Sequence, residues 1–103
     1  LVTLNDPVFV EAARELAKRM MRDDSTSSDK TIAAGYRLLT FKAIPEKKLK
    51  VLDRLYDQAM EEYKADTAAV HAMTADKEGR PELAAMTVVA NALLNLDEVV
   101  MKE

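Results

Sequence analysis

Apolar residues recur three and four positions apart along most of this 103-residue chain, which is the spacing of one face of an α-helix. Pro7, Pro45 and Pro81 each stand just ahead of such a stretch. Proline at the first position of a helix loses no hydrogen bond, and its φ angle is already close to the helical value. Only two glycines, Gly35 and Gly79, interrupt a composition rich in helix formers. The chain therefore predicts an all-α fold.

The periodic stretches predict four main helices and a short fifth. Residues 23–29 are rich in serine and acid and are interpreted as a connecting loop. Residues 65–80 are ambiguous: Asp66 or Thr67 could cap a short helix to about Met73, ahead of a charged loop at 76–80. The main helices are predicted to be Pro7 to Met21, a helix capped by Ser28 or Asp29 that runs to Thr40, Glu46 to Lys64, and Pro81 to Leu94.

Each predicted helix carries an apolar stripe, and helices this short need such stripes packed together to be stable in water. We therefore expect a single domain, residues 1–103, built as a small antiparallel bundle. Gly35 inside a helix predicts a close approach of two helices. The predicted inward residues are Phe9, Ala13, Leu16 and Met20 with Val8 and Ala12; Ile32, Gly35 or Tyr36, and Leu39; Leu49, Leu52, Tyr56, Ala59 and Tyr63 with Val51 and Leu55; and Leu83, Met86 or Thr87, Ala90, and Leu93 or Leu94.

Charge and composition argue against several classes of partner. The formal net charge is −3 with both signs interspersed, so we expect no nucleic-acid partner. The densest basic stretch, residues 47–50, is interpreted as a solvated helix face. No apolar run approaches the ~20 residues that span a bilayer, so membrane insertion is not expected. The chain begins at Leu1 and moves almost at once into a helix cap, from which we expect a segment of a longer protein.

No group of residues forms a catalytic, cofactor-binding or metal-binding pattern, and whether the chain belongs to an enzyme stays open. His71 is the only histidine and has no spaced partner. The six methionines are interpreted mainly as core, and the adjacent acidic pairs as caps or solvated faces. The chain has no cysteine, which removes thiolate metal sites and a Cys-x-x-Cys-His haem attachment from this segment.

Four polar residues near the two ends are candidates for a contact with another domain or a ligand: Asn5, Asp6, Asn95 and Asp97. Asp6 is sufficiently explained as the N-cap of the first helix. Asn95 stands among leucines and has two structural interpretations. It caps the last helix in a left-handed conformation, or it bridges to the backbone of a neighbouring segment.

Several phrases, read in order, resemble the C-terminal part of a domain family of unknown function. That family lies at the end of large exported proteins of planctomycetes and related bacteria, often behind a cytochrome-c-like domain. The phrases cover most of the chain, while residues 65–80 contribute little. They are Leu4-Asn5-Asp6-Pro7-Val8-Phe9-Val10-Glu11-Ala12-Ala13-Arg14, Ile44-Pro45-Glu46-Lys47-Lys48-Leu49, Glu82-Leu83-Ala84-Ala85-Met86-Thr87, and Ala92-Leu93-Leu94-Asn95-Leu96-Asp97-Glu98.

The chain departs from the family pattern at two positions. Relatives commonly have a glycine after the second helix and a tryptophan in the last one, where this chain has Phe41 and Met86. Phe41 puts a left-handed cap in doubt there, although the turn itself need not be lost. The resemblance implies an exported parent protein in the periplasm or at the cell surface, with a haem domain elsewhere in it and this chain as its C-terminal segment. It assigns no catalytic residues.

Three hypotheses of function follow. The leading one is a non-catalytic helical domain that packs against the other domains of a larger bacterial cell-envelope protein and stabilises or positions them. The alternative is part of an enzyme, acting on polysaccharide, whose active site is completed by upstream residues. The third is a peptide-binding module, which requires an exposed apolar groove.

Overall fold

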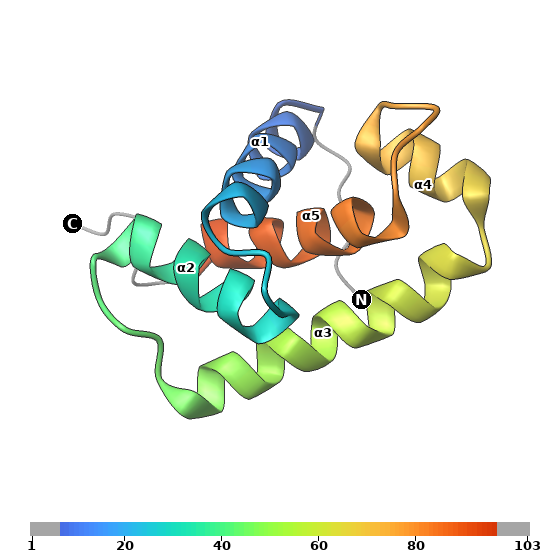
Figure 1. Ribbon diagram of the computed structural model, residues 1–103. Helices are drawn as coiled ribbons and strands as arrows, with labels where there is room; N and C mark the ends of the chain where they lie inside the picture. Colours follow the sequence, from blue (N-terminus) through green and yellow to red (C-terminus); the bar gives the residue numbers. More distant parts are fainter. Residues whose placement is uncertain (1–6, 97–103) are drawn as a thin grey trace.

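The computed structural model describes residues 7–96, with side chains from Val10 onward. This part of the chain contains five helices and no strand, which confirms the predicted all-α fold (Figure 1). The first helix runs two residues further than predicted. The predicted cap of the second helix is wrong, because Ser27 occupies the cap position and Ser28 and Asp29 already lie inside the helix. The helices are α1 (Pro7–Asp23), α2 (Ser28–Thr40), α3 (Glu46–Lys64), α4 (Thr67–Thr74) and α5 (Pro81–Leu94).

Helix α5 occupies the centre of the molecule. It contacts all four other helices, most extensively α1 and α3, and Figure 1 shows it running between them. Every residue from Ala84 to Asn91 is buried, so the predicted stripe covers only part of its buried surface. A helix that is apolar on all sides is typical of a position inside a core. The alanines at 84, 85 and 90 let neighbouring helices approach closely.

The buried side chains form a large core and a smaller one where α3 meets α5. Most predicted inward positions lie in these clusters or pack against them. Ala12 and Val51 do not: both are exposed, since α1 and α3 cover the core with other faces. Val8 and Phe9 have side chains outside the described set. The large core contains Ala13, Ala17, Met20, Ile32, Tyr36, Leu52, Met86, Val89, Ala90 and Leu93, and the smaller one Ala59, Ala85 and Val88.

Gly35 marks the close contact between α1 and α2 that its place inside a helix predicted. A Cβ atom at this position would lie 2.6 Å from Sδ of Met20. Met20 is itself completely buried, so its side chain has little room to withdraw. The backbone of Gly35 does not have a positive φ, so the glycine is needed here for space.

Two helices end in the left-handed conformation on residues other than glycine. Phe41 follows α2 with φ 61°, and its N–H donates to the carbonyl of Arg37 at 2.8 Å. The doubt that a phenylalanine raises about a left-handed cap is therefore resolved in favour of the cap. Thr40 holds the turn, because its hydroxyl donates to the carbonyl of Tyr36 at 2.9 Å and accepts from the N–H of Lys42 at 3.2 Å. Ala75 ends α4 in the same way with φ 57°.

The ambiguous region 65–80 contains the short helix α4 and a loop. Of the two possible caps, Asp66 is the one used: its Oδ1 accepts from the N–H of Ala69 at 3.0 Å. Arg14 of α1 donates from Nε to the carbonyl of Met73 at 3.1 Å, which ties α4 to the rest of the molecule. None of the described helices combines the length and apolar character required to cross a bilayer.

Candidate functional site

Asn95 is the one sequence-predicted site residue that the structure describes. It ends α5 with φ −99° and ψ 1°, so the left-handed alternative is wrong. The bridging alternative placed its side chain on the backbone of a neighbouring segment, whereas the described bond is to its own helix. Its amide Nδ2 donates to the carbonyl of Asn91, one turn earlier, at 2.8 Å. This bond closes the end of its own helix and removes the need for the left-handed turn. Asn5, Asp6 and Asp97 lie outside the described residues, so the structure does not bring the four candidates together.

Asn91 is a buried polar residue that the sequence argument did not single out. Only 3% of its surface is exposed, and its Oδ1 accepts no hydrogen bond within residues 7–96. Buried polar atoms are nearly always paired, so an unpaired acceptor in the central helix is unusual. An amide inside the otherwise small and apolar stretch from residue 88 to 94 was the available signal.

The described titratable residues are the first place where site chemistry would be expected, and they form no metal-binding group. Within residues 7–96 no three histidine, cysteine or acidic side chains converge as metal ligands. His71 is partly exposed, and no interaction of its imidazole is found in that part of the chain. Burial raises the pKa of Tyr56, and the nearby charge of Glu82 raises it further. A phenol with a raised pKa stays protonated at neutral pH and is not an activated nucleophile.

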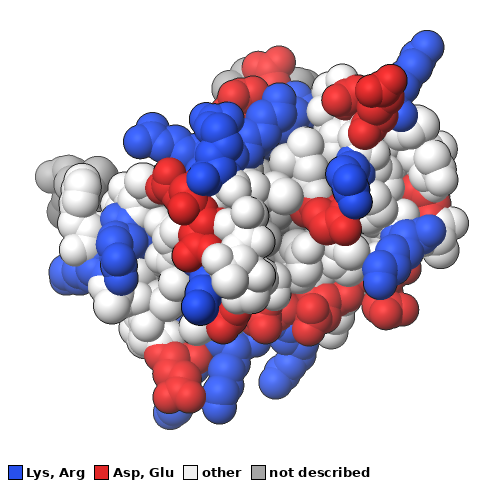
Figure 2. Space-filling view, viewed as in Figure 1, with Lys and Arg blue, Asp and Glu red and all other residues white. Residues whose placement is uncertain are grey.

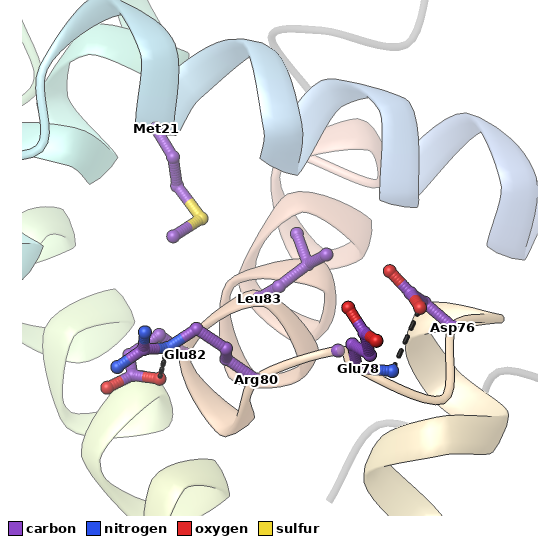
Figure 3. Close-up of a pocket in the computed structure, with 7 residues that line it drawn as sticks. Met21, Asp76, Glu78, Arg80, Glu82 and Leu83 are labelled. Carbon is purple, nitrogen blue, oxygen red and sulfur yellow. Dashed lines mark hydrogen bonds and ion pairs between the residues drawn. The ribbon is translucent and has the colours of Figure 1, made fainter.

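One surface depression lies between the end of α1 and the loop that leads into α5 (Figure 3). Its volume is about 390 Å³, and Met21 and Leu83 supply apolar side chains. Asp76 and Glu78 lie together on the loop, where the N–H of Glu78 donates to Oδ1 of Asp76 at 2.9 Å. Across the depression, Arg80 and Glu82 form an ion pair of 3.5 Å between Nε and Oε1.

This acidic depression has two ordinary structural explanations. The bond between Asp76 and Glu78 is an Asx turn that shapes the loop. Glu82 lies in the first turn of α5, where the helix dipole favours a carboxylate. Glycosidase chemistry requires two carboxyl groups that face each other across a substrate, and here the carboxylate of Glu82 is instead paired with Arg80.

A second, more apolar groove lies at the start of α3. It has a volume of about 420 Å³, and its surface is almost entirely carbon. Leu52 is buried and forms part of the floor, while Val51 leaves 61% of its surface exposed. We call this feature the α3 groove. Its lining residues are Pro45, Lys47, Lys48, Val51, Leu52 and Leu96.

Two large apolar side chains of the described region are exposed, one at each end of the segment from the end of α2 to the second turn of α3. They are Phe41, with 87% of its surface exposed, and Val51. Phe41 is the first residue of the connection 41–45 between α2 and α3, and Val51 lies on the second turn of α3. Phe41 also contributes to a depression of about 460 Å³ beside the end of α1. We call residues 41–51 the α2–α3 corner.

Positive charge is concentrated at this corner. Residues 41–51 contain four lysines and one glutamate, in a chain whose net charge is −3. Lys48 extends over the ring of Tyr36, with Nζ 5.7 Å from the ring centroid. Lys50 forms an exposed ion pair with Glu46 at 3.8 Å. The face shown in Figure 2 otherwise has acidic and basic side chains intermingled.

Comparisons with protein-family models, with curated proteins and with solved structures give no match to this chain.

Proposed function

We propose that this chain is a non-catalytic helical domain that packs against other domains of a larger bacterial cell-envelope protein and stabilises or positions them. The observation that carries the proposal is Phe41. It is an aromatic residue exposed over 87% of its surface and held in a left-handed conformation. Both properties are unfavourable in the isolated domain. The exposed ring leaves apolar surface in contact with water, and the left-handed backbone costs about 1–2 kcal/mol.

A docking role explains why such a residue stands there. Aromatic side chains at the centre of an interface contribute much of the binding energy, and strained residues are concentrated at functional positions. The α3 groove supports the same role, because exposed apolar surface next to exposed Val51 is typical of a contact with another protein. The resemblance supplies the context of an exported parent protein. A haem attached covalently through a Cys-x-x-Cys-His motif in that parent would be held by another domain, since this chain has no cysteine.

The proposal is tested by association between the 103-residue chain and the rest of its parent protein, produced separately. We expect binding that the Phe41→Ala substitution weakens by about tenfold, the effect of losing one interface residue worth about 1.4 kcal/mol. Lys77→Ala, in the loop after α4, is the matched surface control and should bind as the unchanged chain does. If the two parts do not associate, the docking role is wrong.

The acidic depression favours a second candidate, in which the chain forms part of an enzyme that acts on polysaccharide. In that case Asp76 and Glu78 would contact substrate next to upstream catalytic residues. Substituting both by their amides in the full parent protein would abolish activity without unfolding it. Unchanged activity in that variant, and in variants of His71, Asn95 and Asp97, would remove the enzyme hypothesis.

A further inference from the structure

The α3 groove allows the partner to be described by its chemistry. We propose that the groove binds a partner segment that carries apolar side chains flanked by carboxylates, from another domain or chain. The inference rests on the proposed docking function and deepens it, because it names which surface is used and what kind of segment fits. Three observations carry it: the shape and apolar lining of the groove, the placement of its lysines, and the charge of the corner.

The apolar part of the groove fits one or two inserted aliphatic side chains. Its volume of about 420 Å³ is bounded by Pro45, Val51 and Leu96 around the buried Leu52. Val51 is a large aliphatic residue of α3 that is exposed, whereas its neighbour Leu52 is buried in the core. Covering Val51 and the groove with apolar side chains removes this surface from water.

The stability of α3 does not explain Lys47 at the edge of the groove. Lys47 lies in the first turn of α3, where the helix dipole disfavours positive charge. Lys48 lies in the same turn but has a structural role, because it contacts the ring of Tyr36. Lys47 also lies three positions before Lys50, so two like charges are neighbours on the helix surface. Glu46, in the same turn, is already paired with Lys50. Residues that break a local rule without a structural gain are typical of functional positions.

Lys47 supplies the free positive charge at the edge of the groove. It is exposed, and within residues 7–96 it forms no ion pair. A carboxylate on the partner would pair with it and would also meet the favourable end of the α3 dipole. Lysine stems beside an apolar groove contact the same partner with their methylene groups. The combination selects a segment whose apolar side chains are flanked by carboxylates.

Charge also decides between this partner and two others. A second copy docked about a two-fold axis through the corner would bring four lysines against four lysines, which is repulsive. Nucleic acid requires an extended basic surface, and the acidic residues intermingled on the molecule interrupt it (Figure 2). An acidic and apolar protein segment satisfies both the lining and the charge of the groove.

The test is a titration of the full 103-residue chain with three synthetic helical peptides of about twelve residues, followed by NMR chemical shifts. The first peptide has leucine on one face and glutamate elsewhere, the second replaces every glutamate by lysine, and the third replaces every leucine by serine. We expect the first to bind with shifts centred on residues 45–52 and 96, and the other two to bind at least about tenfold more weakly. Equal binding of the lysine peptide, or shifts centred elsewhere, would overturn the proposal.

Two substitutions separate binding from folding. Lys47→Glu places a favourable charge at the start of α3, so it should leave the chain folded while weakening binding of the acidic peptide by about tenfold or more. Val51→Asp should weaken it by a similar factor, about tenfold. Lys77→Glu makes the same charge change outside the groove and should leave the site intact. Equal loss in Lys47→Glu and Lys77→Glu would show that only net charge matters and would contradict the proposal.

A variant that ends at Leu96 tests whether the occupant comes from the chain itself. Binding of the acidic peptide that appears only in this shortened variant would overturn the proposal of an external partner.

Failure of the groove inference can be told apart from failure of the docking function. If the acidic peptide does not bind but Phe41→Ala still weakens association with the parent, the groove inference fails and the docking function stands.

Discussion

At the scale of single residues, Phe41 lowers the stability of the isolated chain, and we assign its role to docking. Its left-handed backbone is a cost to folding, and its exposed ring makes little contact that would repay that cost within the described molecule. Gly35 is the opposite case, since its lack of a side chain is required by the buried Met20. At both positions glycine should be more stable than alanine, at Phe41 because of the backbone conformation and at Gly35 because of the space that Met20 fills.

We predict that Phe41→Gly is more stable than Phe41→Ala by about 1 kcal/mol. Both variants lose the ring, but only glycine adopts the left-handed conformation without steric cost. Urea unfolding of the two variants measures the difference directly. Ala75→Gly, at the left-handed end of α4, should show the same sign because its φ is 57°. A Phe41→Gly variant no more stable than Phe41→Ala would contradict the strain that we assign to this residue.

Gly35→Ala should destabilise the chain by about 1–3 kcal/mol, because its methyl group would overlap the buried side chain of Met20. Alanine improves helix propensity by up to about 1 kcal/mol, which offsets part of the loss. Adding Met20→Ala to the Gly35→Ala variant should cost less than Met20→Ala costs in the original chain. Strictly additive free energies in this double-mutant cycle would show that the two side chains do not compete for space.

At the scale of elements, the helices differ in how far the sequence determines them. Proline and the 3.6-residue period predicted α3 and α5 at the observed bounds, because both are signals within the element itself. The burial of α5 on all sides was not predicted, since it depends on how four other helices surround it. The side chain of Asn95 was misjudged for a similar reason: Asn91 provides an acceptor within α5, so no left-handed turn is needed.

The short helix α4 depends on its cap more than the longer helices do. Asp66→Ala removes the acceptor for the N–H of Ala69 and should cost about 1 kcal/mol. Asp57→Ala, on the exposed face of α3, is the matched control because no hydrogen bond of its side chain is found within the described residues. Hydrogen exchange of residues 67–74 should rise in the Asp66 variant and not in the control. Equal protection in both variants would refute the capping role.

At the scale of the whole molecule, the packing of α3 against α5 makes the free energy of unfolding fall as pH rises through the alkaline range. Burial raises the pKa of Tyr56 and Tyr63, which lie on α3, so the folded state keeps these protons longer than the unfolded state does. The stabilising effect is fully present below the ordinary tyrosine pKa of about 10 and is lost as pH rises through the raised values.

Tyr56→Phe should therefore lose less stability than the unchanged chain between neutral pH and about pH 11, since phenylalanine has no proton to release. The free energy of unfolding, measured in urea at both pH values, gives the comparison. Tyr63→Phe should behave in the same direction. An identical alkaline loss in all three proteins would show that neither phenol contributes to it.

The surface of the molecule supports the functional claim in the same physical terms. The large apolar side chains that the described residues leave exposed, Phe41 and Val51, belong to one lysine-rich corner. The sequence shows these lysines, and from sequence alone we interpreted them as a solvated helix face. It does not show the groove beside them, because Leu96 at the end of α5 forms part of the lining. That juxtaposition arises only when α3 and α5 are packed together, so no pattern within either helix could predict it.

The most direct test of the docking function is the affinity of the 103-residue chain for the rest of its parent protein, measured by calorimetry. Binding that both Phe41→Ala and Val51→Asp weaken by about tenfold, while Lys77→Ala leaves it unchanged, is the result we predict. Absence of binding, or equal binding by all four proteins, would contradict a docking role for the α2–α3 corner.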